Sequence, residues 1–211
     1  MQVDLAVPAH RWIYFFGVEE NETLEWFRRT IRPGMTFVDI GAHEGQYSQL
    51  AAGGVGREGR VHAFQPDARS FSRLTANIAL NGFDNVHAHL LSLAAKPGKG
   101  RRATLDDWAS NADLRPGQGI DFIKIDVRGL EEQVIRGGTE VLARFAPTIV
   151  CQFEETRLNG AGSSSAALKR YLEDLGYRIG RISGGRLIPV HLNEVHRSTK
   201  LILTPARRIG C

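Results

Sequence analysis

Between residues 36 and 153, the chain alternates short apolar runs, rich in β-branched residues, with longer amphipathic stretches. The runs predict strands at 36–40, 60–64, 85–90, 122–126 and 148–153. The stretches between them predict helices at 46–52, 68–80, 130–137 and 139–144. Because several strands are apolar at consecutive positions, helices should cover both faces of the sheet. The sequence therefore predicts an α/β fold with a mostly parallel, doubly wound sheet.

After residue 160 the pattern changes. Residues 163–175 predict a helix. Residues 177–182 and 200–204 predict two strands joined by a polar segment that contains glycine. We expect these strands to form an antiparallel hairpin that closes one edge of the sheet.

The N-terminal part is expected to form an extension on the core. Residues 21–29 predict a short amphipathic helix, and four aromatic residues precede it: Trp12, Tyr14, Phe15 and Phe16. These aromatic side chains either pack on the sheet or form a lid over a site. A chain of 211 residues fits one domain, which we divide into an extension at 1–32 and a main domain at 33–211.

Charge and cysteine content limit the class of protein. The 27 Lys and Arg residues against 23 Asp and Glu give a net charge of +4, which does not require a nucleic-acid partner. The densest basic cluster is either a solvated loop or a contact for an anionic partner: Lys96, Lys99, Arg101 and Arg102. Cys151 and Cys211 provide no disulfide framework, which favours a reducing compartment. Without a signal peptide or a long apolar run, we expect a soluble cytoplasmic protein that does not enter a membrane.

The first predicted strand ends in a glycine loop with the pattern Asp39-x-Gly41-x-x-x-Gly45. Gly41 permits a tight turn, and Gly45 lets a ligand or a neighbouring backbone approach. The carboxylate of Asp39 would repel a phosphate and attract an ammonium group. The loop is thus either a structural turn or a cofactor loop that differs from a dinucleotide-binding loop.

The second predicted strand ends at Gln65-Pro66-Asp67, a position where such folds contact a ribose. The amide of Gln65 can bond sugar hydroxyls without the charge of a carboxylate. Alternatively, the segment caps the helix that begins near residue 68, with Asp67 as the N-cap.

Five segments, in this order, resemble the FkbM family of S-adenosylmethionine-dependent methyltransferases. They are VDIGAHEG at 38–45, AFQP at 63–66, NIALNG at 77–82, TLDD at 104–107 and IKIDVRG at 123–129. The resemblance extends from about residue 12 to about residue 154. It implies a Rossmann-like class I methyltransferase fold, S-adenosylmethionine as the cofactor and S-adenosylhomocysteine as its product. Family members mostly methylate hydroxyl groups of sugars and secondary metabolites.

The resemblance also implies where the cofactor binds. Asp39 would lie near the ammonium group of the methionine moiety, with Gly41 and Gly45 beneath it, and Gln65 with Pro66 at the ribose. Leu91 and Ser92 would face the adenine, and His43 in the loop is either a contact or a bystander.

Two positions depart from the family pattern. Gln65 stands where the family usually has glutamate, which predicts weaker cofactor binding. Arg128 stands where the family has glutamate in Asp-Val-Glu-Gly, and it either favours an acidic acceptor or faces solvent. The segment 94–120 is shorter than the corresponding region of many members of the family, where insertions contact the substrate.

Candidate catalytic residues come from the ends of the later strands. Asp126 would orient or deprotonate the acceptor and contact the cofactor, or else cap the following helix. Lys124, within a buried strand, needs a partner such as Glu154 or Asp126, unless it reaches the sheet edge. Glu154 would contact the substrate or hold a divalent cation with Asp126, although no ligand spacing supports a metal.

The histidines provide no metal site by spacing. His87 and His89 share one face of a predicted strand, but the sequence names no third ligand. His191 and His196 lie in the late polar segment and are candidates for lining the acceptor pocket.

The leading hypothesis is an S-adenosylmethionine-dependent O-methyltransferase that acts on a hydroxyl of a small molecule. A catalytically silent, methyltransferase-like module that binds a nucleoside or a partner protein is the rival, motivated by Gln65 and Arg128. A nucleic-acid methyltransferase is the third hypothesis, and the absence of an Asn-Pro-Pro-aromatic segment counts against it. The sequence does not decide between a monomer and a homo-oligomer.

Overall fold

The structure is a computed structural model that describes residues 21–112, 114, 119–191, 194 and 199–206. Its strands are β1 (Thr36–Ile40), β2 (Arg60–Phe64), β3 (Val86–His89), β4 (Ser92–Leu93), β5 (Arg102–Ala103), β6 (Phe122–Ile125), β7 (Thr148–Phe153), β8 (Tyr177–Ser183), β9 (Arg186–Pro189) and β10 (Thr199–Pro205). Its helices are α2 (Asn21–Thr30), α3 (Gln46–Val55), α4 (Ala68–Leu80), α5 (Leu105–Asn111), α6 (Glu131–Arg136), α7 (Thr139–Phe145), α8 (Glu155–Gly160) and α9 (Ser165–Asp174). The described residues do not include the N-terminal aromatic residues Trp12, Tyr14, Phe15 and Phe16, nor His196 and Cys211.

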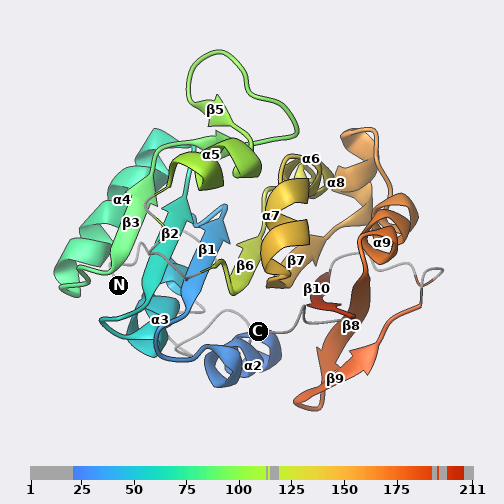
Figure 1. The fold of residues 1–211 in the computed structure, drawn as a ribbon, viewed down its shortest axis with the longest axis horizontal. Helices are drawn as coiled ribbons and strands as arrows, with labels where there is room; N and C mark the ends of the chain where they lie inside the picture. The colour runs from blue at the N-terminus through green and yellow to red at the C-terminus, as the bar shows by residue number, and fades with distance from the viewer. Residues whose placement is uncertain (1–20, 113, 115–118, 192–193, 195–198, 207–211) are drawn as a thin grey trace.

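The central sheet has the predicted α/β arrangement (Figure 1). Its strand order is β3-β2-β1-β6-β7-β10-β8-β9. The strands from β3 to β7 in this order pair in parallel, and the C-terminal strands pair antiparallel. The predicted fold class is therefore confirmed.

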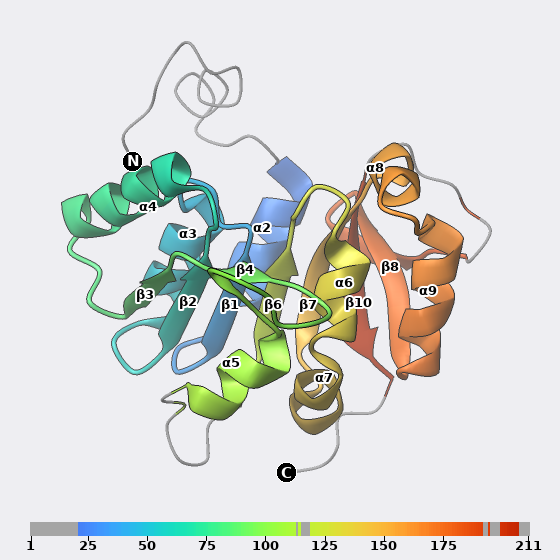
Figure 2. The same ribbon diagram turned by 90° about the horizontal axis from the view of Figure 1, so that it is seen from above.

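Helices cover both faces of the sheet. Figure 2 shows α2, α3 and α4 on one face and α5, α6 and α7 on the other. On the first face, the ring of Phe27 in α2 packs against Phe37, Tyr47 and Phe122. Successive strand residues point to opposite faces, so Val38 joins the core on the second face. This double burial explains why the strands are apolar at consecutive positions.

The C-terminal strands differ from the predicted hairpin. Strands β8 and β10 pair antiparallel as expected, but β10 lies between β7 and β8 rather than at the edge. The edge strand is β9, which lies in the predicted polar connection and forms a hairpin with β8. Its turn consists of Gly184 and Gly185, with φ of 58° and 72°. Two successive positive φ values are the signature of a type I′ turn, which a Gly-Gly pair favours.

Two short helices were also missed. Helix α5 begins with a capping box in which Asp107 N–H donates to Thr104 Oγ1 at 2.9 Å and Thr104 N–H donates to the Asp107 carboxylate at 3.3 Å. Helix α8 follows directly after β7. In addition, β6 ends at Ile125, one residue before the predicted end, so Asp126 lies in the loop that follows.

Candidate functional site

The strand order reverses between β1 and β6. The chain continues from β1 to β2 on one side and from β6 to β7 on the other, so the loops that follow β1 and β6 diverge. In open α/β sheets such a point forms the ligand-binding crevice. Gly41, in the first loop, has a φ of 78°, and a Cβ at this position would lie 2.0 Å from the carbonyl oxygen of Asp126. The two loops can approach this closely only because residue 41 is glycine.

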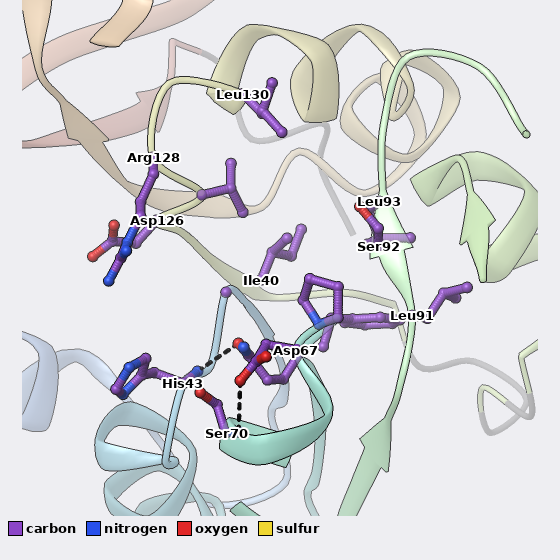
Figure 3. A pocket seen from close by; sticks show the side chains of 15 residues that line it. Ile40, His43, Asp67, Ser70, Leu91, Ser92, Leu93, Asp126, Arg128 and Leu130 are labelled. Carbon is purple, nitrogen blue, oxygen red and sulfur yellow. Dashed lines mark hydrogen bonds between the residues drawn. The ribbon is translucent and has the colours of Figure 1, made fainter. Parts of the chain in front are cut away.

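A cavity of about 330 Å³ lies at this point (Figure 3). Its lining residues are Ile40, Gly41, His43, Phe64, Gln65, Pro66, Asp67, Ser70, Leu91, Ser92, Leu93, Asp126, Val127, Arg128 and Leu130. This volume is within the range of small-molecule sites. Most of the predicted cofactor-binding residues are thus brought together in one cavity.

The lining follows the order of the strands across the sheet. Leu91 and Ser92 follow β3, Gln65 follows β2, and the loops after β1 and β6 contribute His43 and Asp126. Figure 3 shows His43 and Asp126 on one side of the cavity and Leu91 and Ser92 on the opposite side. The cavity therefore has a largely apolar end near β3 and a polar end between β1 and β6.

The segment after β2 serves both the cavity and the next helix. Gln65 is buried, and its Oε1 accepts a hydrogen bond from the backbone N–H of His43 at 3.0 Å. Its amide NH₂ group can still donate to a ligand. Asp67 caps α4, because its Oδ2 accepts the Ser70 N–H at 2.8 Å, and this bond lowers the pKa of Asp67. The capping alternative is confirmed for Asp67, while Gln65 lies at the cavity.

Asp39 does not line the cavity. Its fully buried carboxylate points toward α3, where Ser48 Oγ donates to Oδ2 at 2.6 Å. Lys124 Nζ lies 3.2 Å from the other oxygen, Oδ1. The position of Asp39 within β1 fixes this direction, because side chains alternate between the two faces of a strand. The predicted contact between Asp39 and an ammonium group of the cofactor is therefore not supported by this geometry.

Lys124 has a different partner from those expected. It pairs with Asp39 rather than with Glu154 or Asp126, because Asp39 and Lys124 are register neighbours on the adjacent strands β1 and β6. Its Nζ also donates to the carbonyl oxygen of Gly41 at 2.7 Å. Lys124 does not line the cavity, and it contacts the glycine loop through this hydrogen bond.

Gly45 and Glu154 also lie outside the cavity lining. Gly45 has a φ of 92°, and a Cβ there would lie 2.6 Å from Leu74 Cδ1 of α4. It therefore allows a turn and close helix packing rather than ligand approach. Glu154 immediately precedes α8, and its carboxylate pairs with Arg157 at 2.6 Å.

Asp126 does line the cavity, and about a third of its side chain is exposed, 34%. Lys200 Nζ lies 3.9 Å from Asp126 Oδ2 and 5.3 Å from the centroid of the Tyr47 ring. The alternative of a helix cap is wrong, because the N-cap position of α6 is Leu130. Asp126 is thus available to a ligand at the polar end.

The loop after β6 is held by Glu131, which the sequence analysis did not single out. The Glu131 carboxylate accepts the backbone N–H groups of Val127 and Gly129, at 2.9 to 3.1 Å. Burial raises the pKa of Glu131. Between the two bonded residues, Arg128 has a φ of 55°, which is uncommon outside glycine. An acidic residue in the first turn of a helix, two positions after Gly129, was the available signal.

The histidines form a stack away from this cavity. The rings of His87 and His89 flank His62 of β2, with centroids 5.2 and 5.5 Å from the His62 ring. His62 is thus a third imidazole that the sequence did not identify, and with Trp108 the stack lines a second cavity of about 600 Å³. Nevertheless, in the described part of the chain no group of three or more His, Cys, Asp or Glu residues is arranged to hold a metal ion. His191 lines neither cavity, and its N–H donates to the Glu194 side chain.

The histidine stack predicts an acid-sensitive fold. Burial, followed by the neighbouring His89 and His87, lowers the pKa of His62 from 6.5 to about 3. His62 therefore binds a proton near pH 6.5 in the unfolded chain but stays neutral at that pH in the folded chain. The free energy of unfolding consequently falls as the pH drops below about 6.5. Between pH 7.5 and 5, we expect His62 to contribute a loss of about 2 kcal/mol.

Urea denaturation of the wild type and of His62→Phe at both pH values measures this contribution. Phenylalanine keeps a ring in the stack but cannot titrate. The variant should lose about 2 kcal/mol less than the wild type over this range. Equal losses in both proteins would show that His62 is not responsible.

Comparisons with known proteins find methyltransferases. Residues 101–179 match the model of the methyltransferase FkbM domain. The ribosomal RNA large subunit methyltransferase E of Buchnera aphidicola is 32% identical over 138 residues, 59% of this chain and 62% of the relative. The chain therefore spans less than two thirds of that relative's length.

Solved structures share the fold. A SAM-dependent O-methyltransferase from Thermotoga maritima has a TM-score of 0.56 at 17% identity, covering 90% of this chain and 66% of that one. A methyltransferase FkbM from Methylobacillus flagellatus has a TM-score of 0.57 at 16% identity, covering 81% and 43%. At these identities the likeness establishes the Rossmann-like methyltransferase fold. None of the helices formed by the described residues is long and apolar enough to cross a bilayer.

Proposed function

Because residues 101–179 match the FkbM methyltransferase domain and the chain has a class I methyltransferase fold, we propose that it methylates a hydroxyl group of a small molecule with S-adenosylmethionine. The observation that carries the proposal is the cavity at the switch point, whose lining changes from apolar to charged across the strand order. A nucleoside linked to an amino acid has the same sequence of chemical groups. The activity of the whole protein is part of this proposal.

The residues present fit such a cofactor. Leu91 and Leu93 offer apolar contact for a purine, and the buried Gln65 offers an amide donor for ribose hydroxyls. Gly41 lets the loop after β6 approach the loop after β1, so that both line the cavity. Asp126 provides charge at the far end, where the amino-acid part would lie.

When bound, S-adenosylmethionine supplies an activated methyl group on a sulfonium, which is transferred by direct displacement. The protein then has to position the acceptor oxygen and exclude water. Asp126 is the residue best placed for this task, because it lines the cavity beside the loop of Gly41. An Oδ atom of Asp126 would accept the hydrogen bond of the acceptor hydroxyl and then its proton. Lys200, 3.9 Å from Oδ2, would hold that carboxylate in place.

Calorimetry and a transfer assay test the proposal together. S-adenosylhomocysteine should bind with one-to-one stoichiometry, and no heat from it or S-adenosylmethionine at about 1 mM would contradict the proposed cofactor. Asp126→Asn should lower kcat at least about 100-fold, while changing the affinity for S-adenosylhomocysteine less than about 10-fold. The acceptors are a panel of hydroxylated sugars and secondary metabolites, with radioactive methyl transfer as the readout. Binding without transfer to any of them would favour the catalytically silent module.

A ribosomal RNA acceptor is the second candidate, favoured by the 32% identity to an rRNA methyltransferase. Exposed basic residues between β4 and β5 and at the start of β5 support it: Lys96, Lys99, Arg101 and Arg102. Figure 1 shows this loop projecting from the body above α5. RNA binding that weakens steeply with salt, and that Lys96→Glu and Lys99→Glu together reduce, would favour RNA over a small molecule.

A further inference from the structure

Arg128 is exposed to solvent at the polar end of the cavity, and none of the described residues forms an ion pair with it. Arg128 lines the cavity. Within the described residues, it makes no ion pair or hydrogen bond through its side chain. Figure 3 shows it on the same side as Asp126, opposite Leu91 and Ser92. A positive charge without a partner, placed on a cavity wall, favours an anionic ligand group there.

The backbone presents Arg128 in one conformation. Glu131 binds the N–H groups on either side of it, from Val127 and Gly129. Gly129 has a φ of 100°, and a Cβ there would lie 2.6 Å from the carbonyl oxygen of Arg157. The positive φ of Arg128 is thus maintained by its surroundings, and its side chain starts from a fixed point.

The carboxylates closest to this end already have other partners. Asp39 pairs with Lys124 at 3.2 Å, below the glycine loop. Asp126 has Lys200 at 3.9 Å. The third carboxylate near this end, Glu131, accepts the backbone N–H groups of Val127 and Gly129. Among the described residues, none of these three carboxylates forms an ion pair with Arg128.

We propose that Arg128 binds the carboxylate of the methionine moiety of the cofactor. The inference rests on the proposed function and assigns a cavity residue to one group of the ligand. With purine near Leu91 and ribose near Gln65, the amino-acid part lies at the β1–β6 end. Arg128 lines the cavity at that end, and its guanidinium group complements a carboxylate.

The test compares two ligands that differ only in that carboxylate: S-adenosylhomocysteine and its decarboxylated analogue. Calorimetry is run on the wild type, on Arg128→Gln, on Arg128→Lys and on Arg170→Gln, a control on the exposed surface of α9. The wild type should bind S-adenosylhomocysteine about 30-fold more tightly than the analogue. Arg128→Gln should bind both ligands with affinities within about threefold of each other, whereas Arg128→Lys should recover part of the difference.

The other outcomes contradict either the role of Arg128 or the proposed function. If Arg128→Gln binds S-adenosylhomocysteine as the wild type does, the proposal is wrong and Arg128 is left to contact the acceptor. If Arg128→Gln weakens both ligands equally, Arg128 supports the loop and does not bind the carboxylate. If the wild type binds neither ligand, the proposed function itself fails. Circular dichroism of each variant confirms that these comparisons are made on folded protein.

Discussion

Replacing Lys124 by methionine is expected to destabilise the fold by about 3 to 5 kcal/mol. The change removes the partner of the Asp39 carboxylate, which is fully buried, with Lys124 Nζ 3.2 Å away. It also removes the hydrogen bond to the carbonyl oxygen of Gly41. A buried carboxylate without its cation retains the full penalty of leaving water. Urea denaturation at pH 7.5, followed by circular dichroism, measures the loss.

The double variant Asp39→Asn with Lys124→Met separates the charge effect from the loss of packing. Asparagine keeps an acceptor for Ser48 and carries no charge. The double variant should therefore be more stable than Lys124→Met alone by about 2 kcal/mol. Lys99→Met, in an exposed loop, should be close to the wild type. Strictly additive losses from the two single changes would show that the pair is not coupled.

Asp39→Asn alone distinguishes the structural role from the role expected by family resemblance. If Asp39 held the ammonium group of the cofactor, the variant would lose affinity for S-adenosylhomocysteine and keep its stability. With Lys124 as the partner, the main effect should be a loss of stability, because a buried lysine is left without its counter-ion.

The buried strands were predictable because burial on both faces requires apolar residues at consecutive positions. Thr36–Ile40, Arg60–Phe64 and Thr148–Phe153 have the predicted bounds, and each is a run of mostly apolar residues covered on both faces. The edge strand β9 lacks this pattern, since it contains Arg186 and Pro189 and only its Gly-Gly turn identifies it.

The site was predictable at the level of strand ends. Gln65, Leu91 and Asp126 follow different strands, and parallel strands bring their carboxyl ends to one edge. The partners of buried charges were not predictable in the same way. Asp39 and Lys124 meet because β1 and β6 are neighbours in a particular register, which depends on topology rather than on local pattern.

Replacing Gly41 by alanine is expected to lower stability by about 3 kcal/mol and to abolish measurable binding of S-adenosylhomocysteine. The φ of 78° is one that an alanine adopts only with strain of about 1 to 2 kcal/mol. In addition, the new Cβ would lie 2.0 Å from the carbonyl oxygen of Asp126, so the two loops would have to separate. Overpacking of this kind adds about 1 to 3 kcal/mol. The separation would also widen the polar end of the cavity, where Gly41 and Asp126 both line the wall.

Gly34→Ala is the matched control for this change. Gly34 has nearly the same φ, 83°, but a Cβ there would have no atom within 4 Å. It should therefore show only the backbone strain, about 1 kcal/mol, and bind S-adenosylhomocysteine as the wild type does. The difference between the two variants isolates the contact between the loops after β1 and β6. Equal losses of stability, with ligand binding intact in both, would mean that this contact does not shape the cavity.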